Sequence, residues 1–141
     1  MPHIDITNVN WLAVGASGVG VFFLGAAWYT ALFGKVWPRV NGYSPEQLAA
    51  MQKKRPMAVF LGCMVVCYLV AAYAMAVLMS TAGWSGVHSG IHAGLLAFVI
   101  VAAFRLTGHL ASPKQIGAYF IDIGFDLVSL VAMGAILGGW R

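Results

Sequence analysis

The sequence predicts an all-α fold: an integral membrane bundle of four transmembrane helices, with antiparallel neighbours and both termini outside. Two observations on the whole chain support this. Of its 141 residues, 61% are hydrophobic and only 9% are charged, whereas soluble domains average about 25% charged residues. In addition, four segments are apolar over the roughly 20 residues that a helix needs to cross a bilayer. No length is left for a second domain, so residues 1–141 are expected to form a single four-span domain.

The four predicted spans differ mainly in how many polar residues interrupt them. They cover about residues 11–33, 57–80, 88–110 and 116–140. The third is the most interrupted, because it carries histidines and Arg105. Residues 1–10 contain no Lys or Arg, so the basic region of a cleavable signal peptide is missing and the first span is expected to be retained.

The connections between the spans predict the orientation. The first, residues 34–56, holds five of the eight basic residues: Lys35, Arg39, Lys53, Lys54 and Arg55. The second, residues 81–87, holds none, and the third, residues 111–115, holds Lys114. Positively charged connections stay in the cytoplasm, so the first and third connections are expected inside. Three tryptophans then fall at the outer interface, where an aromatic belt belongs: Trp11, Trp84 and Trp140.

The first connection contains a helix start of its own. Ser44 is a candidate N-cap, Pro45 suits the first helical position, and Gln47 completes a capping box. This pattern predicts a short cytoplasmic helix over about residues 45–55. Its apolar positions and basic end suit the headgroup region, and a solvated linker helix with a topogenic charge cluster is the alternative.

Two aspartates inside the fourth span form the sharpest functional clue. Asp122 and Asp126 are four residues apart, so they share one helix face. A carboxylate at membrane depth is expensive and marks a functional site by default. Counting outward from the connection places Arg105 level with Asp122, which predicts an Arg105–Asp122 ion pair that locks the hairpin. The alternative is that Arg105 reaches the cytoplasmic headgroups.

Asp126 lies deeper, about 15 Å from the start of its span. No basic residue is expected at that depth, so the sequence predicts an Asp126 that is protonated, solvated in a cavity, or shared with another subunit. Tyr119, Asp122, Asp126 and Ser129 follow one another at helical spacing as a polar face. Such a face indicates a proton-linked or cation-binding path, or else a hydrogen bond to a neighbouring helix that holds the bundle together.

A metal site is a further hypothesis. His88 and His92 share a helix face near the outer start of the third span. Two histidines supply only half of a site, so solvated interfacial histidines are the alternative. Cys63 and Cys67, with nearby methionines, invite a Cu(I) interpretation, although such residues are ordinary in apolar helices. No cofactor is therefore predicted, beyond a metal at His88 and His92.

Glycine spacing predicts tight helix packing. Gly86, Gly90 and Gly94 repeat every four residues, and Gly134 and Gly138 do the same in the fourth span. Ala16 and Gly20 form a similar pair in the first span. Small residues at this spacing let helix backbones approach closely, either within one chain or between copies.

Several function classes lack support in the sequence. The basic residues lie mostly in one short connection rather than on an extended face, so nucleic acid is not an expected partner. No phosphate-binding glycine loop follows a strand. Ser129 has no base at its depth, which argues against a hydrolase. A role other than catalysis is therefore favoured.

Three stretches also carry a family resemblance: Asn10–Val14 (NWLAV), Trp28–Trp37 (WYTALFGKVW) and Ser129–Gly138 (SLVAMGAILG). Together they resemble a bacterial family of small four-span inner-membrane proteins catalogued as a domain of unknown function. The resemblance implies an inner-membrane helical bundle and no particular activity. It also singles out Trp28, Tyr29, Lys35 and Trp37, for which interfacial anchoring is the simplest role. The family pattern has an Asn-like residue at 122 and often His at 126, where this chain has Asp.

The leading functional hypothesis is transport or permeation of a small solute, a cation or protons along a polar path. This path would involve Asp122, Asp126, Ser129, Tyr119 and Arg105. So short a chain can barely enclose a pore alone, which favours a homo-oligomer in the lipid bilayer. The alternatives are an accessory or scaffold subunit of a larger membrane complex, with the glycine faces as docking surfaces, and a membrane metal- or cofactor-binding protein.

Overall fold

The computed structural model describes residues 3–112 and 115–140. Within these residues the chain is helical and contains no strand. The elements are α1 (Trp11–Ala27), η1 (Trp28–Leu32), α2 (Val36–Val40), α3 (Pro45–Lys54), α4 (Met57–Thr81), α5 (Val87–Ala111) and α6 (Ile116–Gly139). Four helical segments are long and apolar enough to cross a membrane: residues 11–32, 57–81, 87–111 and 116–139. The chain is therefore a small multi-pass membrane protein with the predicted all-α fold.

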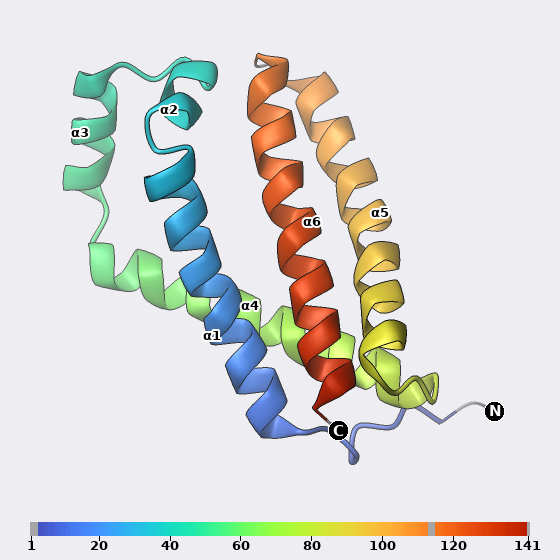
Figure 1. Cartoon of the computed structure of the whole chain (residues 1–141). Helices are drawn as coiled ribbons and strands as arrows, with labels where there is room; N and C mark the ends of the chain where they lie inside the picture. Colours follow the sequence, from blue (N-terminus) through green and yellow to red (C-terminus); the bar gives the residue numbers. More distant parts are fainter. Residues whose placement is uncertain (1–2, 113–114, 141) are drawn as a thin grey trace.

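The long helices alternate in direction, as four consecutive spans must. Helices α1, α6 and α5 run side by side, and α4 crosses obliquely behind them (Figure 1). Both chain ends lie at one end of the bundle, and α2 and α3 lie at the other, beside the adjoining ends of α5 and α6 (Figure 1). Lys114, which contributes to the predicted charge asymmetry, lies outside the described residues. The short helix begins as expected, with Ser44 and Gln47 forming a reciprocal capping box.

The tightest contact in the bundle joins α5 to α6 through glycines. A Cβ atom added at Gly90 would lie 1.9 Å from the carbonyl oxygen of Gly134, and one at Gly134 would lie 2.0 Å from that of Gly90. At the end of this contact the Gly86 amide donates to the Gly138 carbonyl at 2.9 Å. The glycine faces of α5 and α6 are thus occupied by each other within one chain, and they are not free to dock a partner. In a membrane the hydrophobic effect does not drive helices together, so the van der Waals contacts of such a close approach stabilise the pair instead.

The first span packs through a different residue than expected. Gly20 has open space where a Cβ would be, and Ala16 is exposed. Instead Gly18 is buried against Leu69 of α4. The Ala16–Gly20 pair therefore faces outward, and Gly18, on the opposite face of the helix, makes the α1–α4 contact.

The apolar core lies in the half of the bundle that contains the chain ends. Its members come from all four long helices and include Ala13, Met79, Ala93 and Met133, each at most 1% exposed. By contrast, the first two turns of α4 contribute nothing, because residues 57–63 are all exposed. The end of the bundle near α2 is thus the less tightly filled one, and the polar site lies there.

The segment before α1 is fastened to both neighbouring helix ends. The Asp5 carboxylate accepts hydrogen bonds from Asn8, Thr7 and the Ser80 hydroxyl, and the Asp5 amide donates to Thr81 Oγ1 at 3.1 Å. The hydrogen bonds from Asn8 and then Thr7 hold the pKa of Asp5 well below its ordinary value of 3.8. Asn10 caps α1 and donates to the Trp140 carbonyl at 2.8 Å.

The predicted orientation has a direct test. A reporter that is active only in the cytoplasm, fused after the last residue of the chain, is expected to stay silent because both termini are predicted to face outward. The same reporter fused after Gly42, between α2 and α3, is expected to be active. The reverse pattern would show that the basic first connection faces outward.

Candidate functional site

The site begins where the first span changes from an α-helix to a π-helix. Over Trp28–Leu32 the turns widen, and the Phe33 amide donates to the Trp28 carbonyl, five residues back, at 2.9 Å. Such wide turns are rare and are frequent at functional sites. The indole Nε1 of Trp28 donates to the Ile121 carbonyl of α6 at 3.1 Å. Gly124 makes room for this ring, since a Cβ there would lie 3.1 Å from it.

Asp122 accepts hydrogen bonds from two aromatic side chains of the Trp28–Trp37 stretch, which carries the family resemblance. The Tyr29 hydroxyl donates to Asp122 Oδ1 at 2.8 Å, and the indole Nε1 of Trp37 donates to the same oxygen at 3.1 Å. Interfacial anchoring is therefore not the whole role of Tyr29 and Trp37. Lys35 fits the simpler role, because it is exposed and forms no hydrogen bond or ion pair with any described residue. The motif and the aspartates, which the sequence presented as separate clues, meet here.

Arg105 pairs with Asp126 rather than with Asp122. Its Nε and Nη2 both donate to the Asp126 carboxylate, with Nη2 at 3.1 Å from Oδ1. The closest approach to Asp122 is 3.9 Å, between Nη1 and Oδ2. The predicted Arg105–Asp122 lock is thus only the weaker of two ion pairs. The expectation that no basic residue reaches Asp126 is wrong.

The direction of helical side chains explains this correction. The Cα–Cβ bond of a helical residue tilts toward the N-terminus of its helix. In the antiparallel α5–α6 pair, Arg105 therefore leans toward the core, while Asp126 leans back toward the site. The ends of the two side chains are therefore closer in depth, by about one helical turn, than their backbone positions are. Counting residues from the connection ignores this tilt and so selects Asp122.

The two aspartates differ in exposure. The side chain of Asp126 is 10% exposed and that of Asp122 is 24% exposed, whereas that of Arg105 is 41% exposed. Both carboxylate oxygens of Asp126 accept hydrogen bonds from Arg105, and this two-point ion pair compensates its charge. With both carboxylates ionised, the cluster of one arginine and two aspartates keeps one negative charge, and Asp122 is the residue that presents it.

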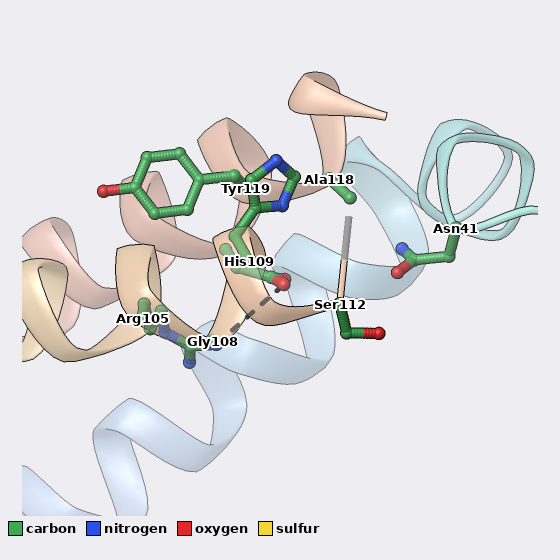
Figure 2. Close-up of a pocket in the computed structure, with 8 residues that line it drawn as sticks. Asn41, Arg105, Gly108, His109, Ser112, Ala118 and Tyr119 are labelled. Carbon is green, nitrogen blue, oxygen red and sulfur yellow. Dashed lines mark ion pairs between the residues drawn. The ribbon is translucent and has the colours of Figure 1, made fainter. Parts of the chain in front are cut away.

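A cavity of about 370 Å³ opens beside Asp122. Figure 2 shows Arg105, Tyr119 and His109 along one part of it and Asn41 facing Ser112 across another. The dashed line in Figure 2 marks the Arg105–Asp122 ion pair. Gly108 and Ala118 complete the lining. Tyr119 belongs to the cavity through its ring, 5.6 Å from that of His109, while its hydroxyl donates to the Ala102 carbonyl at 3.2 Å.

The polar face of α6 does not continue as an open path. Ser129 is buried, and its hydroxyl has no hydrogen-bond partner within the described part of the chain. Neither Asp126 nor Ser129 lines the cavity. One turn beyond Ser129 the face ends at Met133, which is 1% exposed. The cavity is therefore a vestibule at one end of the bundle, closed toward the other end by the core.

Sequence reasoning missed three polar residues of the cavity, which are His109, Ser112 and Asn41. His109 lies four residues after Arg105 on α5, so helical spacing alone could have placed it on the same face. Asn41 follows α2 and gave no such signal, because its position depends on how the first connection folds back onto α6. Its side chain donates to the Trp37 carbonyl at 2.8 Å.

The histidine pair lies at the other end of α5 from Arg105. The rings of His88 and His92 are 4.4 Å apart, and His92 Nδ1 is 2.9 Å from the His88 carbonyl oxygen. Within residues 3–112 and 115–140, no three His, Cys, Asp or Glu side chains converge as metal ligands. Asp5, a carboxylate at the same end of the bundle, already accepts hydrogen bonds from Thr7, Asn8 and Ser80. Cys63 and Cys67 are exposed and unpaired on α4.

Comparison with known proteins adds a family but no activity. The family model described as "Protein of unknown function (DUF1761)" matches residues 12–138. No curated protein and no solved structure matches the chain.

Proposed function

This chain belongs to the family of proteins of unknown function DUF1761, and from its site we propose that it is a small membrane permeation protein. It admits a small polar solute, a cation or protons to the cavity at Asp122. The single observation that carries the proposal is a carboxylate inside a spanning helix that lines a cavity of about 370 Å³ and is held there by the hydrogen bonds from Tyr29 and Trp37. Intramembrane carboxylates in such cavities mark substrate and ion pathways.

The residues of the cluster have separate roles in this proposal. Arg105 and Asp126 form the floor, where a two-point ion pair fixes α5 against α6. Asp122 receives the solute, and Tyr29 and Trp37 hold its carboxylate in place. Such positioning by neighbouring donors lowers the reorganisation that binding requires.

Passage through the bundle requires a second arrangement of the helices. In the present arrangement the cavity opens at one end only, and Ser129 and Met133 lie buried beyond it. Opening the other end would move the core half of α6 relative to α4. The contact between α5 and α6 is too close to slide, so we propose that these two helices move as one unit against α1 and α4.

We further propose a bacterial inner-membrane location with both termini outside, which puts the cavity on the cytoplasmic side. A homo-oligomer fits the exposed start of α4, where residues 57–63 touch no other helix closely enough to be buried. That apolar surface also favours a second candidate function, an accessory subunit that docks through α4 in a larger membrane complex.

Flux into liposomes tests the permeation proposal. Vesicles containing the protein are expected to take up labelled methylammonium, labelled glycine or protons faster than empty vesicles. Asp122→Asn is expected to lower that uptake at least about 10-fold, because it removes the only uncompensated charge of the cluster. The asparagine keeps an acceptor for Tyr29 and Trp37, so folding is expected to persist.

The matched control is Asp5→Asn, which removes a carboxylate outside the spans and should leave uptake unchanged. Uptake equal to that of empty vesicles would contradict the permeation proposal. In that case, recovery of the intact protein in one defined larger membrane complex would support the accessory role.

A further inference from the structure

We infer that the solute taken up by the cavity is zwitterionic, with an ammonium and a carboxylate on one carbon, as in an α-amino acid. This inference rests on the proposed function and names its substrate class. It follows from the hydrogen-bonding capacity that the cluster at Asp122 and Arg105 leaves unused.

The unused acceptor belongs to Asp122. Its Oδ1 already accepts two hydrogen bonds, from Tyr29 and Trp37. Its Oδ2 accepts none from the described residues, because the nearest donor, Arg105 Nη1, is 3.9 Å away and outside hydrogen-bond range. An ionised carboxylate oxygen in this state is a binding point for an ammonium group.

The unused donors belong to Arg105. Asp126 occupies its Nε and one Nη2 hydrogen, which leaves the Nη1 group without a hydrogen-bond acceptor among the described residues. The guanidinium carries five N–H groups and binds carboxylates in a planar, two-point geometry. His109, one helical turn further along α5, lines the same cavity and adds a second nitrogen donor when its proton faces inward.

Both signs of charge in one cavity select against simple ions. A lone cation bound at Asp122 would leave the Nη1 donors of Arg105 without an acceptor. A lone anion bound at Arg105 would lie close to the like charge of Asp122, which is unfavourable. A zwitterion satisfies both groups at once and brings no net charge into the membrane.

The rest of the cavity suits a small polar substituent on such a solute. Asn41 uses its amide nitrogen for the Trp37 carbonyl, so its oxygen remains as an acceptor. Ser112 adds a hydroxyl opposite it (Figure 2). A volume of about 370 Å³ is at the small end of the range for ligand pockets, which begins near 300 Å³.

Three probes of similar size separate the charge requirements. Binding of glycine, methylammonium and acetate to the protein in nanodiscs can be compared by saturation-transfer nuclear magnetic resonance. Glycine is expected to bind at least about 10-fold more tightly than either singly charged probe. Asp122→Asn is expected to weaken glycine binding at least about 10-fold. Ser112→Trp is expected to block it by filling the cavity mouth without touching the ion cluster, and His88→Ala, at the far end of α5, should leave it unchanged.

Each outcome decides the inference. Methylammonium or acetate binding as tightly as glycine would overturn the zwitterion assignment, and so would the absence of binding by all three probes. Neither result would by itself remove the permeation proposal, because methylammonium or proton flux that depends on Asp122 would still support it. Glycine binding that survives both Asp122→Asn and Ser112→Trp would place the ligand elsewhere and overturn the inference as well.

Discussion

Replacing Gly90 by alanine is expected to disrupt the bundle more than any other single methyl group added to this chain. The new Cβ would lie 1.9 Å from the Gly134 carbonyl oxygen and 2.6 Å from its carbon. These are backbone atoms, so no side chain can turn aside and α5 must move away from α6. Overpacking of this kind lowers the free energy of unfolding by about 3 kcal/mol or more. Thermal unfolding of the protein in mild detergent, followed by tryptophan fluorescence, measures the loss.

The matched control is Gly62→Ala on α4, where a Cβ would meet nothing within 4 Å. Alanine has the better helix propensity by about 1 kcal/mol, so this control should be neutral or slightly stabilising. Both variants share that propensity gain, and the difference between them isolates the α5–α6 contact. Equal stability of the two variants would mean that the glycine faces are not packed against each other in one chain.

Breaking the Arg105–Asp126 pair is expected to have the second largest effect on stability. Arg105→Gln leaves Asp126, whose side chain is 10% exposed, without its cation. Removing one partner of a buried pair lowers the free energy of unfolding by about 3–5 kcal/mol. Because Arg105 itself is 41% exposed, solvent can relieve part of this, so we expect the lower end of that range.

A double-mutant cycle checks the pair directly. Asp126→Asn alone leaves the Arg105 guanidinium without its carboxylate partner. The double variant Arg105→Gln with Asp126→Asn removes both charges. Its free energy of unfolding should therefore be higher than the sum of the two single-variant losses predicts. The expected coupling is about 1.5–3 kcal/mol, the range for charge-assisted hydrogen bonds. Asp122→Asn, the same substitution one turn away, should couple to Arg105→Gln by less than about 1 kcal/mol, because its ion pair is 3.9 Å long. Equal coupling at both positions would restore the pairing that residue counting predicted.

Some of the candidate site could be predicted from residue chemistry and spacing. Asp122, Arg105 and Tyr119 were identified because charged and polar groups are conspicuous in an apolar span, and all three line the cavity. Tyr29 and Trp37 were singled out by resemblance alone, and nothing local in the chain showed that their donors would meet Asp122. Their placement depends on the π-helix at Trp28–Leu32 and on the way α2 folds back, neither of which has a clear sequence pattern.

The sequence by itself determined that the protein is a four-span membrane bundle and where each span lies to within a residue or two. The reason is that a bilayer imposes length and polarity on every spanning segment separately, so the information is local. It also determined which residue types were out of place in the spans. Only the tertiary structure decided which partner each of them has. Arg105 pairs with Asp126 because each side chain tilts toward the N-terminus of its own helix. In an antiparallel helix pair, two side chains can therefore meet although their backbone positions lie at different depths. The glycine faces of α5 and α6 pack against each other because the two backbones are in contact. Such pairing depends on two helices at once, so it cannot be inferred from either segment alone.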